Sequence, residues 1–314
     1  MKTFHFEAFA SPTVQMLHRL MQQRGWKDAQ AAFFSDESLV FPADIATTLE
    51  YKHLLAVHCQ QQGFDFLPMT YVIDDDSWSD VLSTLPKQVS KWILKPSMLN
   101  NGQDIHLFHD QAAIMEHFRS PYRMGGVQVL QAYIDPPHLL QGPKAGHKYS
   151  LRLFVIACLP YGVFLYPEGY YNVSLYPYDP NHRGSLQGHV TNEHVLKDRH
   201  NVIQIHTRQY QTLFAPCETA IFTLLQTLFS SFAYPHSELK LAFFGMDVMF
   251  DHDEKIWLLE ANHGPCFPVA GDHPLQLSLY QGFWASILIE LLEPLAAGHS
   301  PELFKLKPLY LLRK

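Results

Sequence analysis

Residues Leu241–Phe267 read LAFFGMDVMFDHDEKIWLLEANHGPCF, and the fold of the chain can be reasoned from them. Two apolar runs flank a polar cluster, Asp251–Lys255, which is typical of two strands joined by a tight turn. A two-residue turn at Asp253-Glu254 would pair residues whose numbers sum to 507 in an antiparallel hairpin. Asp247 would then face Glu260 directly across the two strands.

This pair of acids suggests a metal site. Like charges opposed in a sheet destabilise it unless a positive group lies between them. Asn262 follows Glu260 by two residues, so its amide oxygen would point to the same face as Asp247 and Glu260. Oxygen ligands of these kinds suit Mg²⁺, whose coordination is usually completed by waters and nucleotide phosphates. The alternative is an ordinary hairpin whose acids face solvent.

The composition describes a globular protein. The chain has 314 residues and a mass of 36.1 kDa, which is enough for a large core and two or three lobes. Hydrophobic residues make up 47% and charged residues 17%, which excludes a disordered chain. The formal net charge of -7 argues against nucleic-acid binding and against capture of an acidic partner by net charge.

The cysteines and the N-terminal residues bear on the compartment. Four cysteines, Cys59, Cys158, Cys217 and Cys266, form no CxxC pair and are typical of free thiols, so we expect a cytoplasmic protein. The first residues, MKTFHFEAFASP, lack the apolar core of a signal peptide. No apolar run reaches membrane length, so no membrane partner is expected. The 19 histidines show no HExxH or paired Cys/His spacing and do not favour a zinc site.

Two lysines are placed where they could hold phosphate. A capping-box pattern that begins at Thr47 predicts a helix with Lys52 in its first turn, where a cation is unfavourable unless an anion is near. Lys95 ends a predicted strand and precedes a polar loop, Met98–Asp104, that contains a glycine. Backbone amides and an ammonium in such a loop can cradle phosphate. A solvated surface lysine is the alternative for Lys52.

A further predicted strand, His147–Ala157, carries Lys148, Ser150 and Arg152 on one face. Such a row suggests the floor of a polar cavity, although a solvated edge strand fits equally well. Residues 172–212 are polar and irregular and include the tetrapeptide HVTN. A loop of that length inside a compact domain is usually functional or mobile.

Five ordered motifs resemble the tubulin-tyrosine ligase family of the ATP-grasp superfamily. They are KWILKPSMLNNGQDI from Lys91, QAYIDPPHLL from Gln131, HKYSLRLFV from His147, HVTN from His189, and GMDVMF with WLLEANHGP from Gly245. The resemblance runs from about Gly25 to Pro268. It is specific because the motifs share the family's order and spacing, whereas any one alone is weak.

The resemblance implies an α/β (α+β) ATP-grasp fold of three lobes, with nucleotide held between the central and C-terminal sheets. The expected lobes are an N-terminal lobe over residues 1–72, a central lobe over 73–134 and a C-terminal lobe over 135–314.

The resemblance also implies roles for individual residues. Lys52 and Lys95 would contact phosphates, Gln131, Tyr133 and Ile134 would form the adenine hinge with Lys148 near the base, and Thr191 and Asn192 would face the ribose and phosphates. Asp247, Glu260 and Asn262 would hold Mg²⁺. Arg152 would orient a carboxylate or an acyl phosphate, a task that suits its planar fork. The catalytic group is therefore expected to be Arg152, Lys95 and Glu260.

The implied activity is that of a ligase dependent on ATP and Mg²⁺. ATP would phosphorylate a carboxylate, and an amine would attack the acyl phosphate to form an amide. The expected partners are ATP, an amino acid and a protein or peptide acceptor. One alternative is a catalytically diminished nucleotide-binding interaction module. Another is a ligase that joins small-molecule carboxylates and amines.

Three positions depart from the family's pattern. The family usually reads Lys-x-Asp-Leu-Arg where this chain has Ser150 in the acidic position. A second family arginine is replaced by Asn172, after Glu168-Gly169, and a second loop glycine by Asp104. Ser150 and Asn172 favour the diminished alternative, whereas the metal acids and both phosphate lysines are retained.

Overall fold

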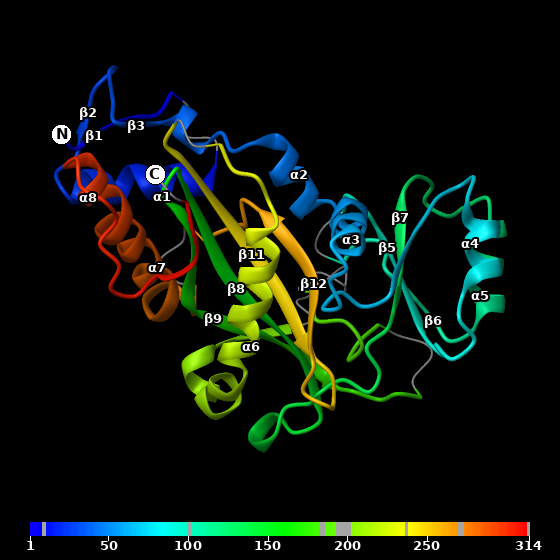
Figure 1. Cartoon of the computed structure of the whole chain (residues 1–314). Helices are drawn as coiled ribbons and strands as arrows, with labels where there is room; N and C mark the ends of the chain where they lie inside the picture. Colours follow the sequence, from blue (N-terminus) through cyan, green and yellow to red (C-terminus); the bar gives the residue numbers. More distant parts are fainter. Residues whose placement is uncertain are drawn as a thin grey trace.

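The computed structural model describes residues 1–7, 11–99, 102–181, 186–192, 202–235, 238–268 and 273–312. Within these residues the chain forms three sheets with helices packed on them (Figure 1). The mixed α/β fold class predicted from the sequence is confirmed.

The N-terminal part contains a small parallel sheet of order β2-β1-β3 and three helices. Its elements are β1 (Thr3–His5), α1 (Pro12–Gln23), β2 (Lys27–Asp28), β3 (Phe34–Ser35), η1 (Asp36–Leu39), α2 (Ala43–Glu50) and α3 (Lys52–Gln61). The capping-box prediction is wrong, because α2 already begins at Ala43 and the Thr47 hydroxyl donates to the Ala43 carbonyl at 2.6 Å. Lys52 is nonetheless at the start of a helix, as the first residue of α3.

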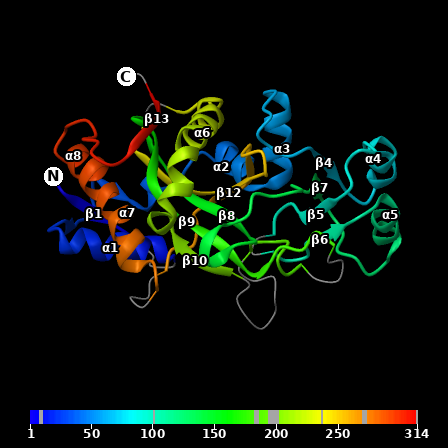
Figure 2. The same cartoon turned by 90° about the horizontal axis from the view of Figure 1, so that it is seen from below.

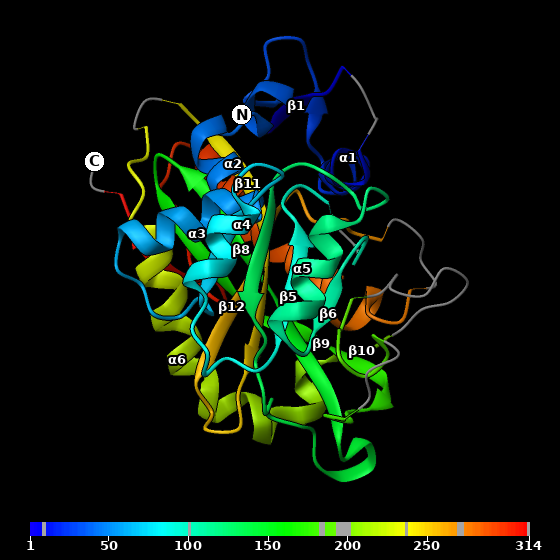
Figure 3. The same cartoon turned by 90° about the vertical axis from the view of Figure 1, so that its right-hand side faces the viewer.

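The central sheet is antiparallel with order β4-β7-β5-β6. Its elements are β4 (Thr70–Ile73), α4 (Trp78–Thr84), β5 (Trp92–Pro96), β6 (His106–Phe108), α5 (Gln111–Arg119) and β7 (Gln128–Ala132). Helices α4 and α5 cover the face turned away from the large sheet, and seen from this side they lie in front of the strands (Figures 1 and 3). The two boundaries between the three lobes remain predictions, and β4 spans the one expected at residue 72.

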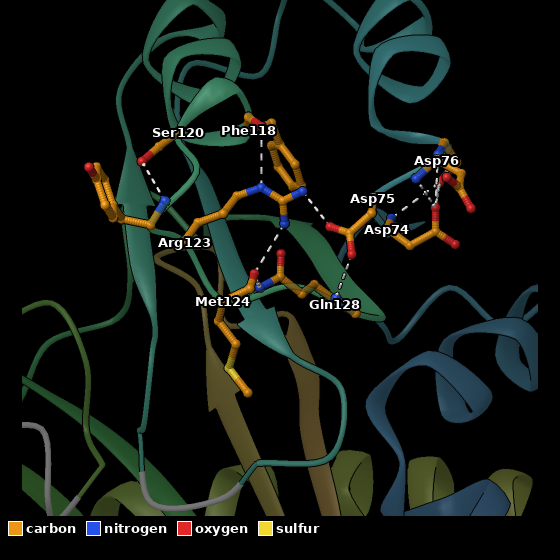
Figure 4. Close-up of polar contacts among 11 residues, drawn as sticks. Asp74, Asp75, Asp76, Phe118, Ser120, Arg123, Met124 and Gln128 are labelled. Carbon is orange, nitrogen blue, oxygen red and sulfur yellow. Dashed lines mark hydrogen bonds and ion pairs between the residues drawn. The ribbon is translucent and has the colours of Figure 1, made fainter.

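A polar clamp fixes the loop between α5 and β7 (Figure 4). The Asp75 carboxylate accepts hydrogen bonds from the Arg123 guanidinium and, at 3.1 Å, from the Gly126 amide. Arg123 also donates to the carbonyls of Phe118, at 3.2 Å, and Met124, at 3.1 Å. β7 runs from this loop toward residues 131–134, which line a pocket of the site described below.

The large sheet is antiparallel, with order β10-β9-β8-β11-β12 and β13 paired with β9. Its strands are β8 (His147–Leu159), β9 (Gly162–Pro177), β10 (Val202–His206), β11 (Lys240–Phe250), β12 (Ile256–His263) and β13 (Lys307–Leu311). The remaining helices are η2 (Gly142–Lys144), η3 (Thr207–Tyr210), α6 (Gln211–Ser230), η4 (Gln276–Tyr280), α7 (Gln281–Ser286), η5 (Ile287–Leu292) and α8 (Glu293–Ala296).

Each face of this sheet buries a separate core. Leu151, Leu153 and Val155 of β8 pack with α2, α3 and α6, whereas Phe154 and Ile156 pack with α1, α7 and η5. Figure 2 shows α6 and α1 on opposite sides of the strands. The second face is the one that continues along β8 to Arg152 and Ser150, so the polar residues lie where the apolar core ends.

One helix, Thr207–Ser230, is long and apolar enough to cross a membrane by length and composition. The sequence reading did not anticipate such a segment. Core helices pass the same test, and residues of this helix, including Ile221, Leu225 and Phe229, are buried in the core of the large sheet.

Candidate active site

The hairpin of β11 and β12 places Asp247 directly opposite Glu260, as predicted. The predicted two-residue turn is wrong, because five residues, 251–255, separate the strands and the Asp251 amide donates to the Lys255 carbonyl at 3.1 Å. Near the turn Val248 pairs with Leu258, one residue out of the predicted register. A β-bulge between the Val248 and Asp247 pairs restores the predicted register at the acids.

The bulge also decides what lines the cavity. Successive residues of a regular strand point to opposite faces, but Leu259 and Glu260 both line the same cavity. Two residues on the bulged strand oppose one on its partner, which re-aims a side chain. An apolar side chain and a carboxylate are thereby brought side by side.

A row of residues crosses the five strands at this level. Glu260 of β12 pairs with Asp247 of β11, Asp247 with Arg152 of β8, Arg152 with Tyr170 of β9, and Tyr170 with His206 of β10. The backbone ladder therefore aligns two acids beside an arginine.

Charge in this row is paired. The Arg152 guanidinium donates from Nε to Asp247 Oδ1 at 2.5 Å and from Nη2 to Oδ2 at 2.6 Å. Gly245 leaves room for this fork, since a Cβ there would lie 3.1 Å from Arg152 Nη1. Lys52 Nζ lies 3.3 Å from Glu260 Oε2. This carboxylate is the nearby anion that makes a cation favourable at the start of a helix.

The acid pair has divided pKa values. Burial raises the pKa of Asp247 to about 6 against the opposing effect of Arg152. Burial acts in the same direction on Glu260, but Lys52, Asp247 and Lys95 outweigh it and hold the pKa of Glu260 at about 2. Glu260 is therefore the more firmly ionised of the two carboxylates at neutral pH.

A second row lies two residues along the same face. Ser150 of β8 pairs with Asn172 of β9, and Asn172 pairs with Gln204 of β10. The two departures from the family's pattern are therefore neighbours. At these two paired positions the family's pattern has an acid and an arginine, whereas this chain has two uncharged side chains.

All of the second row, and all of the first except His206, line a cavity of about 400 Å³. It adjoins a smaller pocket of about 50 Å³, whose apolar lining includes Ile93, Met249 and Leu259. Residues 131–134, at the C-terminal end of β7 and just beyond it, also line this pocket. Lys95 and Asn192 line both spaces. A polar cavity with an apolar pocket at one end is a suitable shape for a ligand with a flat apolar group and a charged tail.

Two lysines, Lys95 and Lys148, line the small pocket. Lys95 Nζ donates to Gln131 Oε1 at 2.8 Å, and burial lowers the pKa of Lys95 to about 8. Lys148 Nζ donates to the Tyr133 hydroxyl at 2.8 Å and to the His189 carbonyl at 2.7 Å, and it lies 4.1 Å from the centre of the Tyr133 ring. Burial lowers the pKa of Lys148 to about 7.

The donor set of the acid pair fits Mg²⁺. Asp247, Glu260 and Asn262 line one cavity, and the Asn262 amide donates to Glu260 Oε1 at 3.4 Å. Among the described residues no group of three His, Cys, Asp or Glu side chains is arranged to hold a metal. A cation here would therefore rely on two carboxylates, one amide oxygen, and oxygens from water or phosphate, which is the usual environment of Mg²⁺.

Every site residue predicted from the sequence lines one of three adjoining spaces. Lys95, Arg152, Thr191, Asn192, Asp247, Glu260 and Asn262 line the large cavity; Gln131, Tyr133, Ile134 and Lys148 line the small pocket; and Lys52 lines a narrow space beside Lys95 and Glu260. The individual roles remain predictions.

Other cavity residues were missed. Met249 follows Asp247 by two residues, so strand alternation could have identified it. Leu259 lines the cavity because of the bulge, and no pattern in the sequence indicates a bulge there. Gln204 lies in a strand, β10, within the segment that was predicted to be irregular. That prediction is wrong for β9 up to Pro177 and for β10, while 182–185 and 193–201 lie outside the described residues.

Comparison with known proteins gives a consistent result. Protein polyglycylase TTLL10 of Macaca fascicularis is 29% identical over 240 residues, which covers 64% of this chain and 38% of that protein. Inactive polyglycylase TTLL10 of Homo sapiens is 30% identical over 240 residues, covering 64% and 35%. Tubulin polyglutamylase TTLL6 of Homo sapiens is 25% identical over 242 residues, covering 66% and 25%.

This chain spans well under half the length of these curated relatives. The model of the tubulin-tyrosine ligase family matches residues 13–289, which include every element of the cavity described above. The chain belongs to the tubulin-tyrosine ligase family.

Proposed function

We propose that this protein is an ATP- and Mg²⁺-dependent ligase that joins an amino acid to a protein or peptide carboxylate through an acyl phosphate. The observation that carries the proposal is the row of Glu260, Asp247 and Arg152, with Lys52 beside it, at the junction of a polar cavity and an apolar pocket. The names of the relatives, polyglycylase and polyglutamylase, support amino-acid addition to proteins as the reaction class. A cytoplasmic location is proposed from the free cysteines.

The nucleotide has a natural direction in this site. The adenine would enter the small pocket beside Tyr133, Ile134 and Leu259, with Lys148 near the base. The phosphates would then extend past Lys95 and Asn192, which line both spaces, toward Lys52 and the acid pair. Bound Mg²⁺ would offset the charge that gathers during phosphoryl transfer.

The residues of the chain would contribute positioning and charge. Asp247, Glu260 and Asn262 would hold the cation, and Lys52 and Lys95 would orient the phosphates. Arg152 would hold the acceptor carboxylate and its acyl phosphate, since a guanidinium can bind two oxygens at once. The amine would then attack the acyl carbon, the bond to the phosphate oxygen would break, and phosphate would leave with the electron pair. Water must be excluded, because it would hydrolyse the acyl phosphate.

A second candidate is a nucleotide-binding module with diminished catalysis. Ser150 and Asn172 favour it, since this chain lacks the charged pair that the family's pattern places there. One relative is itself named an inactive polyglycylase. A ligase acting on small molecules is the third candidate. Acceptor-dependent ADP release separates a ligase from a binder, and dependence on a peptide rather than a free acid separates the first candidate from the third.

The deciding experiment is a mass-spectrometric search for added residues. The protein is incubated with candidate acceptor proteins, tubulin among them, together with ATP, Mg²⁺ and mixed amino acids. A ligase gives acceptor peptides heavier by one or more amino-acid residues, and only when ATP is present. Tight Mg²⁺-ATP binding with no added mass on any acceptor would favour the binding module.

ATP should stabilise the protein more with Mg²⁺ than with a chelator. Ligand at about a hundred times its Kd adds roughly 2.7 kcal/mol to the free energy of unfolding. The acid pair should bind the phosphates only through a cation, because two carboxylates alone would repel them. Thermal melts with and without EDTA measure this, and a melting temperature indifferent to millimolar Mg²⁺-ATP would contradict it.

Nucleotide binding should take up protons at about pH 8. Lys148 and Lys95 have pKa values of about 7 and 8, lowered by burial, and the anionic phosphates should raise them again. As the pH rises past these pKa values, the two lysines lose their protons in the folded, nucleotide-free protein but keep them in the unfolded chain. The folded, nucleotide-free protein should therefore gain stability as the pH rises from about 7 to 9. Calorimetry in buffers of different ionisation enthalpy measures the uptake. Lys148→Met should reduce it, and Lys144→Met, outside the cavity, should not.

Cys266→Ser should leave ligation unchanged within about twofold, as expected of an exposed residue without a structural partner. Cys266 lines the cavity next to the metal motif, and its thiol is free. A carboxylate activated by phosphorylation requires no thioester. Product formation by the variant measures this, and an acceptor trapped on Cys266 would refute it.

A further inference from the structure

The uncharged row described above contains an acceptor without a donor. Asn172 is buried, and its Oδ1 has no hydrogen-bond partner among the residues that the structure describes. Its cross-strand neighbours Ser150 and Gln204 are also uncharged, and Ser150 Oγ already accepts from Thr191 Oγ1 at 2.8 Å. All three residues of the row line the large cavity, so the missing donor can come from a ligand.

The chemistry of this row restricts the ligand group. An amide oxygen accepts a hydrogen bond and repels another acceptor, so carboxylate and phosphate oxygens are poor partners for Asn172 Oδ1. An N–H or O–H donor is a good one. Of the reactants in the proposed ligation, the amine supplies N–H groups and the ribose supplies hydroxyls.

The location of the row favours the amine. Asn172 and Gln204 line the large cavity and not the apolar base pocket. Asn172 lies two strands from Asp247, on β9, and two residues along the strands, a separation of roughly 12 Å at the usual strand spacing and rise. Arg152 lies on the strand between them. Asn172 and Gln204 therefore lie on the side of Arg152 that is remote from the acid pair, whereas Ser150 lies on the strand of Arg152 itself.

We propose that Asn172, with Gln204 beside it, is the amine-binding part of the site and accepts an N–H hydrogen bond from the incoming primary amine of an amino acid. This inference rests on the proposed ligase function. An uncharged acceptor suits a nucleophile that must attack as a free amine. A carboxylate at this position would hold the substrate as an ammonium ion, which has no lone pair for attack.

The step balances without a further co-reactant. The nitrogen lone pair forms the bond to the acyl carbon, and the bond between that carbon and the phosphate oxygen breaks. Phosphate leaves with the electron pair and receives the proton that the nitrogen loses. Asn172 holds the second N–H hydrogen and orients the lone pair, so it is a positioning residue that touches the substrate and takes no proton.

Two substitutions at one position test this. Asn172→Leu removes the acceptor at similar volume, and Asn172→Asp keeps an acceptor of the same shape while adding charge. Glycine and glutamate are the amine probes, titrated in steady-state ligation and, by calorimetry, into protein saturated with Mg²⁺ and a non-hydrolysable ATP analogue. The matched controls are Asn181→Leu and Asn181→Asp, at an exposed position outside the cavity.

The two variants should move in opposite directions. Asn172→Leu should raise the KM for the amine about tenfold or more, a difference of about 1.4 kcal/mol, and leave the KM for ATP unchanged. Asn172→Asp should bind the amine as tightly as the wild type or more tightly, yet turn over more slowly, because it favours the ammonium form. Neither control should change either constant.

Four outcomes would overturn the inference. Equal loss of amine binding in both Asn172 variants would mean that the amide donates or is structural. If Asn172→Leu raises the KM for ATP but not the KM for 2′-deoxy-ATP, Asn172 binds a ribose hydroxyl instead. An unchanged amine KM in Asn172→Leu would remove Asn172 from the subsite while the ligase function stands. A wild-type protein that binds Mg²⁺-ATP but adds no amine to any acceptor would remove both.

Discussion

Glu260→Gln should lower ADP formation by about 100-fold or more, the scale on which loss of one preorganised electrostatic group lowers kcat. Glu260 is the acid held ionised between Lys52 and Asp247, and it lines the cavity through the bulge in β12. Glutamine keeps the volume and one acceptor oxygen but loses the charge that would hold Mg²⁺. The measurement is ADP release with ATP, Mg²⁺ and a working acceptor.

The fold of this variant should survive, because two effects on stability oppose each other. Removing the charge leaves Lys52 without its anion, at 3.3 Å in the wild type, but it also relieves the repulsion that helps to raise the pKa of Asp247. We expect the metal-free melting temperature to change by less than about 2 °C, which is about 1 kcal/mol for a protein of this size. Glu254→Gln, an exposed acid in the turn of the same hairpin, is the control. Wild-type ADP release by Glu260→Gln would remove Glu260 from the site.

Arg152→Lys should lose about 100-fold in product formation although the charge is kept. The Arg152 guanidinium binds both oxygens of Asp247, and we propose that it turns to the oxygens of the acceptor carboxylate. One ammonium cannot reproduce a planar two-point contact. Loss of a charged hydrogen bond in a buried pair should also lower the free energy of unfolding by about 1.5 to 3 kcal/mol.

If Arg152 has only a structural role, Arg152→Lys should lower the free energy of unfolding without the large loss of product formation. Stabilisation by Mg²⁺-ATP is therefore measured alongside both. The shift in melting temperature on adding Mg²⁺-ATP should persist in Arg152→Lys, because Lys52, Lys95 and the acids are unchanged. Arg208→Lys is the matched control, since Arg208 donates from two nitrogens to Glu168 on the same sheet but outside the cavity. Turnover near that of the wild type would make Arg152 a structural strand residue.

Alternation of side chains made much of the site predictable. Lys148, Ser150 and Arg152 share a face in any strand, and the same rule brings Asn262 to the face of Glu260. The opposition of Asp247 and Glu260 was predicted for an incorrect reason, since the turn is longer than assumed and the bulge compensates for it. Hydrogen bonding in the turn, from Glu254 at a positive φ of 63° to the Asp251 carbonyl, is not visible in a pattern of polar residues.

Contacts between distant strands could not be predicted. Ser150 and Asn172 are 22 positions apart in sequence, and only the pairing of β8 with β9 shows that they are partners. The pairing of β10 with β9, which adds Gln204 to the row, joins segments across residues with no regular pattern. The carbonyl of His189 beside Lys148 belongs to a loop, where no periodicity constrains the backbone.

Changes in chain length should have different consequences at the hairpin tip and at the bulge in β12. Lengthening the turn between Phe250 and Ile256 would leave all ladder pairs in place, and loop closure costs little more for a longer loop. Deleting Leu259 would make the ladder regular and keep both the Val248–Leu258 and the Asp247–Glu260 pairs, because Leu259 is the unpaired residue of the bulge. It would, however, remove the apolar side chain that lines the cavity beside Glu260. The hairpin tip should therefore tolerate variation in length among related chains, whereas loss of Leu259 should alter the cavity without shifting the strands.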